Sequence, residues 1–415
     1  MRAQSTYIAK HGTLDRVPEE LVPEWFRERA REARERLEEL RAEEVVVVHH
    51  DDADGLCSGA VVKAALERAG LRTRLICLEK LFPEVVRKLH AGEKQAIFYC
   101  DIGSPHADLI SELNRGRNLV VILDHHDPRL AADPAVLDLN LEHVGFRGEE
   151  DFSGATCCYL FARELDEANK DLSYLALVGS CEIPVGFRGL NAEVLEEALR
   201  EGVVERSGRR LIIRKLGVGV RRLFSVLQVL GPVGYYKGGP ELGVRTALEG
   251  LTPEVEALVR ELEERRKAIN KRLLARLYKR GGLRRSGRIQ WFNAGDAYRG
   301  MGSKVVGTFC SYLSHQRRLV RPDMFVVGLM HMEPEVPGLG RLEGDFVKVS
   351  VRAPKPLRAE IDAGRVPTAV GLLEEATRGF GIAVDGHAYA ASCVIPADRV
   401  EDFIERAAEV SARGA

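Results

Sequence analysis

The chain of 415 residues lacks the features that would point to an exported or membrane-bound protein. No apolar run is long enough to cross a membrane, and the opening stretch MRAQSTYIAKHGTLDR has no apolar centre like that of a signal peptide. The eight cysteines form no CxxC pair, and most lie in apolar runs, as Cys77, Cys100 and Cys393 do. We therefore expect a cytoplasmic protein with buried, reduced thiols and no structural zinc site, and no association with a membrane.

An excess of charge of either sign is also missing, since the net charge is −1 although 30% of the residues are charged. A neutral chain can still bind nucleic acid where its basic residues gather. The segment between Arg260 and Arg288 becomes net basic after Glu264, in RRKAINKRLLARLYKRGGLRRSGR. We interpret it as a candidate track for single-stranded nucleic acid; the alternative is a solvated helix face paired with its own glutamates.

At this length we expect two or three domains. Short apolar strands alternate with helical segments from residue 44 to about 140, which predicts a parallel sheet with helices on both faces. Before it, residues 18–43 predict a charged helix, and residues 153–250 look mostly helical. A long charged helix is expected over 253–280, followed by a more β-rich region. The expected parts are an N-terminal helical extension (1–43), a parallel-sheet domain (44–250), a connector helix (251–285) and a smaller α/β domain (286–415).

Three of the apolar strands end in acids and histidines. VVVVHHDDADG ends in His50, Asp52 and Asp54, AIFYCDIG ends in Asp101, and VVILDHHDP ends in Asp124, His125 and His126. Any one of these acids alone is more often a loop cap or a surface residue. Because ligands bind outside the carboxyl ends of parallel strands, three such ends in succession predict one shared metal site. Carboxylates with neutral imidazoles suit Mn²⁺, Mg²⁺ or Zn²⁺, and this many acids indicate two ions sharing a bridging acid, as in phosphoester cleavage.

HHDDADG, CDIG and LDHHDP resemble the successive motifs of the DHH phosphoesterase superfamily, and the pattern is most similar to the archaeal RecJ-like exonucleases. Residues 286–411 resemble the companion domain called DHHA1, through VKVSVRAP and DGHAYAASCVIP. The resemblance implies a parallel-sheet DHH domain joined by a long helix to a smaller α/β DHHA1 domain. It also implies two divalent ions, most readily Mn²⁺ with Mg²⁺ as the alternative.

The resemblance assigns roles to the matching residues. It implies one ion held by His50, Asp52 and Asp101, and a second held by Asp54, Asp101 and His125. Asp124 would orient the histidines, and His126 would contact the substrate phosphate. In DHHA1, the phosphate or terminal nucleotide would be held by Ser350, Arg352, Gly386 and His387.

Two positions depart from the pattern of this family. Where an Asp usually completes the second metal site, SYLALVGSCEIPVG offers only Glu182, one position early. Asp385 stands where a glycine is common, which places a negative charge beside the expected phosphate site.

The expected function is a single-strand-specific exonuclease acting on DNA or RNA in replication, repair or RNA turnover. One alternative is a nano-RNase or a cyclic-dinucleotide phosphodiesterase. The other is a catalytically weak or inactive replication or repair scaffold that binds the GINS complex, a replicative helicase or a repair helicase. The irregular fourth motif motivates this last hypothesis.

Overall fold

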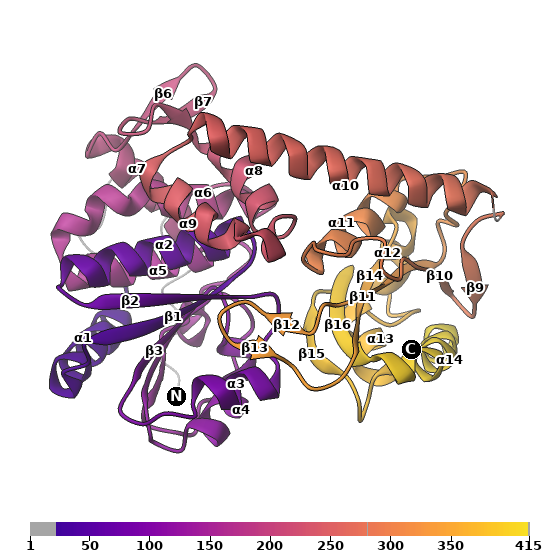
Figure 1. Ribbon diagram of the computed structural model, residues 1–415, viewed down its shortest axis with the longest axis horizontal. Coiled ribbons are helices and arrows are strands. Elements are labelled where there is room, and N and C mark those ends of the chain that lie inside the picture. The colour runs from indigo at the N-terminus through magenta and orange to yellow at the C-terminus, as the bar shows by residue number, and fades with distance from the viewer. Residues whose placement is uncertain (1–21, 280, 414–415) are drawn as a thin grey trace.

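The computed structural model describes residues 22–279 and 281–413, so the expected helix start at residue 18 lies outside the described residues. A five-stranded parallel sheet and a six-stranded mixed sheet are connected by the long helix α10 (Pro253–Lys279), as Figure 1 shows. This arrangement confirms the expected α/β fold class. Among the described helices, none combines the length and the apolar character needed to cross a bilayer.

The five-stranded sheet has helices on both faces because successive apolar side chains of its strands point to opposite faces and are buried on each. Along β1, Val45 and Val47 pack with α1, α2 and α5, whereas Val46 and Val48 pack with α3 and α4 on the other face. The sheet order is β2-β1-β3-β4-β5. The elements are β1 (Glu44–His50), β2 (Arg72–Leu78), β3 (Ala96–Cys100), β4 (Leu119–Leu123), β5 (Val136–Asp138), α1 (Glu24–Leu40), α2 (Ala53–Arg68), α3 (Pro83–Leu89), α4 (Ala107–Asn114) and α5 (Gly154–Leu165).

The carboxyl ends of β1, β3 and β4 lie side by side. The register pairs His49 with Cys100 and Cys100 with Leu123, so the next residue of each strand emerges at the same edge. The chain passes from β1 to β2 on one side of β1 and then to β3 on the other, which makes the β1–β3 boundary a topological switch point. A crevice for a ligand is expected there.

The first described helix belongs to the cover of this sheet. In α1, Phe26, Ala30, Ala33 and Leu37 are buried in the same apolar cluster as β1 and α5. This helix therefore packs as an integral layer of the parallel-sheet unit, and the small alanines let it approach the sheet closely.

Residues 153–250 are mostly helical, as expected. The unforeseen feature is a small antiparallel ribbon of three strands. Its strands are only two to four residues long and contain few fully buried side chains, so they carry little periodic signal. The elements are α6 (Ser173–Gly179), α7 (Gly189–Arg200), β6 (Val204–Ser207), β7 (Arg210–Ile213), β8 (Val218–Gly219), α8 (Val220–Leu230) and α9 (Gly239–Glu249).

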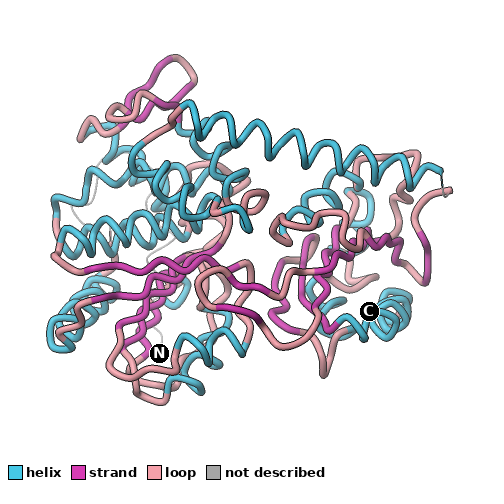
Figure 2. Tube along the Cα trace, in the orientation of Figure 1, coloured by secondary structure: helices cyan, strands magenta, loops and turns pink. Residues whose placement is uncertain are grey.

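The second sheet has the order β15-β16-β14-β11-β10-β9, and only β10 and β11 run parallel. Its helices α11 to α14 flank it, as the tube in Figure 2 shows. β9 begins inside the segment assigned to the connector. The elements are β9 (Arg284–Ser286), β10 (Ile289–Asn293), α11 (Lys304–Leu313), β11 (Phe325–His331), β14 (Phe346–Arg352), α12 (Lys355–Asp362), α13 (Ala369–Ala376), β15 (Ile382–Gly386), β16 (Ala390–Pro396) and α14 (Val400–Ala412).

The two sheets share packed surface. A short hairpin, β12 (Glu335–Val336) with β13 (Gly340–Arg341), reaches from the second half toward the first sheet (Figure 1). Val336 and Leu342 enter the apolar cluster that also contains Val46 and Val48 of β1. The cleft between the halves is therefore closed on one side by apolar contact.

Candidate metal centre

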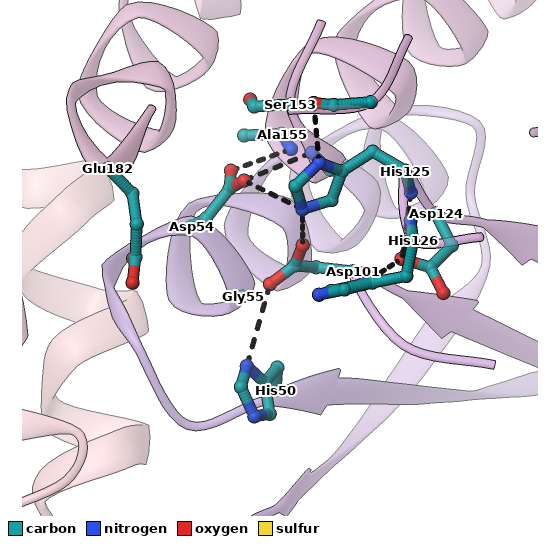
Figure 3. A network of polar contacts seen from close by, with 12 residues as sticks. His50, Asp54, Gly55, Asp101, Asp124, His125, His126, Ser153, Ala155 and Glu182 are labelled. Carbon is teal, nitrogen blue, oxygen red and sulfur yellow. Dashed lines mark hydrogen bonds and ion pairs between the residues drawn. The ribbon is translucent and has the colours of Figure 1, made fainter. Parts of the chain in front are cut away.

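Asp101 stands at the middle of the converging strand ends. Its Oδ2 lies 3.8 Å from His50 Nδ1, and its Oδ1 lies 3.3 Å from His125 Nε2 (Figure 3). Two groups with metal-ligand spacing share it: one adds His50 and Asp52, and the other adds His125 and His126. The sequence prediction that these strand ends meet is therefore supported by their geometry, with Asp101 in the position expected of a bridging acid.

The backbone conformation of Asp101 and two nearby glycines allow the carboxylates to lie close together. Asp101 has φ 60, a left-handed conformation that is uncommon for a residue with a side chain and is often found at functional sites. Gly154 allows its carboxylate to fit, because a Cβ at Gly154 would lie 2.2 Å from Asp101 Oδ1. A Cβ at Gly179 would lie 2.2 Å from Asp54 Oδ1. Both positions therefore require glycine for steric reasons.

Asp54 is held by the first turn of α5. Its Oδ2 accepts a hydrogen bond from Gly154 N at 3.0 Å, and its Oδ1 accepts one from Ala155 N at 2.8 Å. Ser153 caps the same helix by accepting from Thr156 N. The helix N-terminus thus orients a carboxylate that is 3% exposed, and Asp54 Oδ2 lies 3.8 Å from His125 Nε2.

The acids at this site repel one another when all of them are ionised. Burial and the neighbouring Asp54 and Asp52 raise the pKa of Asp101 well above its usual value. Burial raises the pKa of Asp54 as well. Asp101 Oδ1 is buried and makes no hydrogen bond of good geometry, although His125 Nε2 lies 3.3 Å away. A group of buried carboxylates is stable only when protons neutralise it or when positive charge, such as a metal ion, lies among them.

His125 is oriented to supply a nitrogen ligand. Its Nδ1 lies 2.8 Å from the carbonyl oxygen of Gly148, which can only accept, so Nδ1 carries a proton. Nε2 then faces Asp101 Oδ1 and Asp54 Oδ2, and a proton or a metal ion must lie between them. Burial lowers the pKa of His125, but Asp101 and Asp54 outweigh it and raise that pKa well above the usual value. Two oxygens and one nitrogen around one point fit a divalent ion such as Mn²⁺ or Mg²⁺.

Asp124 and His126 form a second polar unit beside the cluster. Asp124 is fully buried; its Oδ1 accepts from His125 N at 2.8 Å and lies 2.7 Å from His126 Nδ1, while its Oδ2 accepts from Ser104 N. Burial would raise the pKa of Asp124, but His126 and these hydrogen bonds lower it to about 2. Asp124 therefore stays charged and orients the His126 ring, whose side chain is 35% exposed.

Asp52 and His50 lie at the start of α2. Asp52 caps this helix by accepting from Gly55 N at 2.9 Å through Oδ1, and its Oδ2 lies 2.8 Å from His50 Nδ1. The same Oδ2 also accepts a hydrogen bond from Lys304 Nζ at 2.5 Å. Burial opposes ionisation of Asp52, but His50 and Lys304 hold its pKa well below the usual value.

Glu182 is not joined to the expected second ion site. Its Oε1 accepts from Lys304 Nζ at 2.9 Å and its Oε2 accepts from Gln228 Nε2 at 2.8 Å. Neither Glu182 nor Asp54 belongs to the two groups of candidate ligands found among the described residues. Asp54 nevertheless lies 3.8 Å from His125 Nε2, whereas Glu182 stands apart from the dashed network in Figure 3. It follows α6 in a short 3-10 turn, which directs its carboxylate toward Lys304.

The four residues expected to hold substrate lie in the second half. Arg352 Nε donates to Ser311 Oγ of α11 at 3.0 Å, and Ser350 is 1% exposed on the same strand. His387 Nε2 lies 3.2 Å from Glu149 Oε1 of the first half, and Gly386 precedes it at φ 134, where a side chain would be strained. His387 thus faces the first half, whereas Ser350 and Arg352 pack against α11.

A cavity of about 50 Å³ lies between the halves. His50, Asp101 and His126 line it together with Lys80 and Asp385. Lys80 of the first half forms an ion pair with Asp385 of the second, and Ser392 Oγ also donates to Asp385. Lys80 and Lys348 lower the pKa of Asp385 despite its burial. The acid that replaces a family glycine is therefore charged and neutralised across the cleft.

Three residues of this site were not predicted from the sequence: Lys304, Glu79 and Lys80. Glu79 accepts hydrogen bonds from Ser303 N and Tyr236 OH at the contact between the halves. The sequence around Lys304, Glu79 and Lys80 resembles that of ordinary turns and surface positions. The available signal was the charge balance, since clustered buried acids require cations, but a chain with 61 Lys and Arg residues does not show which ones supply them.

Residues 44–180 match the family model described as DHH family, N-terminal domain. They are a DHH domain. An uncharacterised protein of Methanocaldococcus jannaschii is 33% identical to the chain over 139 residues, which are 32% of this chain and 31% of that protein. The match therefore spans about a third of the curated relative's length. The predicted resemblance to the DHH superfamily is therefore confirmed over residues 44–180.

Solved structures extend the likeness beyond the DHH domain. RecJ of Thermus thermophilus in complex with Mn²⁺ has a TM-score of 0.66 and 20% identity, covering 95% of this chain and 56% of that chain. An exonuclease RecJ bound to manganese has a TM-score of 0.60 and 20% identity, covering 95% and 97%. CDC45 of Entamoeba histolytica has a TM-score of 0.51 and 9% identity, covering 94% and 99%. At these identities the likeness shows a common fold, including the half that follows the DHH domain.

Proposed function

We propose that this chain is a divalent-metal-dependent phosphodiesterase that shortens single-stranded DNA or RNA from an end. The observation that carries the proposal is Asp101 lying between His50 and His125, with an unpaired buried oxygen and a third strand end beside it. A divalent ion bound there would stabilise negative charge on the phosphate and make a water more acidic. Mn²⁺ is the proposed ion, with Mg²⁺ as the alternative, because the donors are oxygens and imidazole nitrogens and the similar RecJ structures hold manganese.

The protein's own groups would place the substrate. His126 is fixed through Nδ1 by Asp124 and lines the cavity, where it can contact the scissile phosphate. His387 faces the same side of the cleft and can hold a phosphate when its contact with Glu149 is released. Arg352 and Ser350 would bind the terminal nucleotide after rearrangement of the Arg352 contact with α11.

Substrate entry requires the two halves to separate. The cavity of about 50 Å³ is far below the roughly 300–1,000 Å³ of a ligand-sized site. Ion pairs across the cleft, Lys80 with Asp385 and His387 with Glu149, hold it closed. We therefore propose that a strand binds to an opened form.

The basic segment of α10 supports a longer substrate. Lys271, Arg272 and Arg276 are exposed on this helix, which runs between the two halves (Figure 1). Arg272 and Arg276 also line a hollow of about 230 Å³ against Ala297. Exposed cations along a helix that bridges the cleft suit the phosphates of a single strand. This favours an exonuclease over a nano-RNase or a cyclic-dinucleotide phosphodiesterase, which would need no such track.

A second candidate function is a scaffold without turnover, which would bind GINS or a helicase. The observation that favours it is the position of Glu182, whose two oxygens are taken by Lys304 and Gln228. An acid expected to complete a metal site is thereby withdrawn from it.

The test is hydrolysis of an end-labelled single strand with added MnCl₂, comparing the wild type with Asp101→Asn. We expect loss of turnover by about a thousand-fold, equivalent to about 4 kcal/mol of activation free energy. Asp138→Asn is the matched control, because Asp138 is also a buried acid at a strand end but bonds Ser104 and His143 outside the cluster. It should keep activity within a few-fold.

The outcomes separate the candidates. Shortening of long strands that Asp101→Asn abolishes supports the exonuclease. Hydrolysis confined to dinucleotides or cyclic dinucleotides supports the short-substrate alternative and contradicts ours. Strand or partner binding with no turnover that Asp101→Asn removes supports the scaffold.

A further inference from the structure

Lys304, the first residue of α11, extends from the second half into the acids of the DHH domain. Its Nζ lies 2.5 Å from Asp52 Oδ2 and 2.9 Å from Glu182 Oε1. These two carboxylates come from positions 130 residues apart in the chain, and they meet at this ammonium group. Asp52 Oδ2 is also the atom that faces His50 Nδ1 at 2.8 Å. The lysine therefore touches the oxygen that an ion at His50, Asp52 and Asp101 would use.

The backbone just before Lys304 is hydrogen-bonded to the DHH domain. The position of Lys304 is therefore fixed by its backbone as well as by its side-chain contacts. Gly302 N donates to Pro232 O at 2.7 Å, and Ser303 N donates to Glu79. A Cβ at Gly302 would lie 2.8 Å from Pro232 O, which explains the glycine at this close approach. These contacts deliver Lys304 to one place beside Asp52.

Glu182 completes the surroundings of the ammonium. Gln228 Nε2 donates to one of its oxygens and Lys304 to the other, so both are committed. An ammonium group has three donors and one positive charge, and it satisfies two carboxylates without needing a metal ion between them. A divalent ion on the same Asp52 oxygen would face this positive charge at close range, in a setting where water screens little.

We propose that the Lys304 ammonium takes the place of one divalent ion, so that the chain holds a single ion, at Asp54, Asp101 and His125. This inference rests on the proposed metal-dependent function and changes its ion count from the two implied by the family resemblance. The remaining position keeps the unpaired Asp101 oxygen and the fixed His125 nitrogen. Lys304 is then a positioning residue whose single positive charge offsets part of the negative charge of Asp52 and Glu182 when the two halves are closed.

The test counts bound Mn²⁺ directly. Full-length protein is equilibrated by dialysis against MnCl₂ and its metal is measured by mass spectrometry, with electron paramagnetic resonance to distinguish isolated from coupled ions. We expect one isolated Mn²⁺ in the wild type and two coupled ions in Lys304→Met, because removal of the ammonium frees Asp52. Lys304→Arg keeps the charge and should keep one ion.

Lys80→Met is the matched control, since Lys80 also forms an ion pair between the two halves and lines the cavity beside His50 and Asp101, but its partner is Asp385. It should keep one ion; a second ion there would show that any lost positive charge suffices and would overturn the local role of Lys304. Two ions in the wild type would overturn the inference whether or not the Lys304 variants fold, and would leave the metal-dependent function intact. No bound Mn²⁺ in the wild type would overturn the proposed function itself.

Discussion

We expect the buried carboxyl group of Glu79 to make the free energy of unfolding depend measurably on pH. Glu79 follows β2, is 8% exposed, and accepts hydrogen bonds from Ser303 N and Tyr236 OH. Burial, and then the negative charge of Asp51, raise its pKa from 4.5 to about 7. The same carboxyl holds the segment that carries Lys304, so its ionisation bears on the contact between the two halves.

The sign follows from proton binding. Between pH 4.5 and 7 the folded protein keeps the Glu79 proton and the unfolded chain has lost it, so the free energy of unfolding falls as pH rises through that window. A shift of about 2.5 pKa units corresponds to roughly 3 kcal/mol, at 1.36 kcal/mol per unit. Glu79→Gln keeps two polar atoms but cannot ionise. Relative to the wild type it should therefore gain about 3 kcal/mol between pH 4.5 and pH 8.

The assay is urea unfolding of both proteins in EDTA at several pH values across this range. Glu84→Gln is the control: Glu84 also accepts a backbone hydrogen bond from the second half, from Glu343 N at 3.0 Å, but that bond lowers its pKa. Its contribution is present above pH 4.5 and is lost as pH falls, so Glu84→Gln should be the less stable protein at neutral pH. A Glu79→Gln difference that stays constant from pH 4.5 to 8 would refute the reasoning.

Two further outcomes are expected. Gly154→Ala should lower Mn²⁺ affinity by about ten-fold or more, measured by calorimetry, because the new Cβ would lie 2.2 Å from Asp101 Oδ1; unchanged affinity would contradict the steric role of this glycine. Replacing Lys271, Arg272 and Arg276 by Glu should weaken binding of a single strand and make its dependence on the logarithm of salt concentration shallower by about 2, at roughly 0.7 per lost phosphate contact. Unchanged affinity and salt dependence would exclude the α10 track.

Much of the DHH half could be predicted because its strands are marked by short, continuous stretches of the sequence. Short runs of apolar residues predicted β1, β3 and β4, and the parallel arrangement then required their carboxyl ends to share an edge. His50, Asp101 and His125 lie together for that reason. The long charged helix was also foreseen, since 253–280 was expected and α10 covers Pro253–Lys279.

The contacts between the halves could not be predicted in the same way. Lys304 meets Asp52 across 252 positions, and Lys80 meets Asp385 across 305. Such pairings depend on how α10 and the second sheet pack against the first sheet. The periodicity of neighbouring residues in the sequence does not reveal this packing. The short strands β6 to β8 were not predicted for another reason. They have few buried side chains, so their sequences show no clear alternation of apolar and polar residues.

The two departures from the family pattern make physical sense when they are considered together. Glu182 belongs to the first half and pairs with Lys304 of the second; Asp385 belongs to the second half and pairs with Lys80 of the first. Each irregular acid thus meets a lysine on the opposite side of the cleft. Each acid alone would be a charge without a positive partner, and each meets one when the halves close, with Lys304 sharing its charge between Glu182 and Asp52. The two ion pairs therefore stabilise the closed arrangement, and they lie at the positions where an ion and a phosphate were expected.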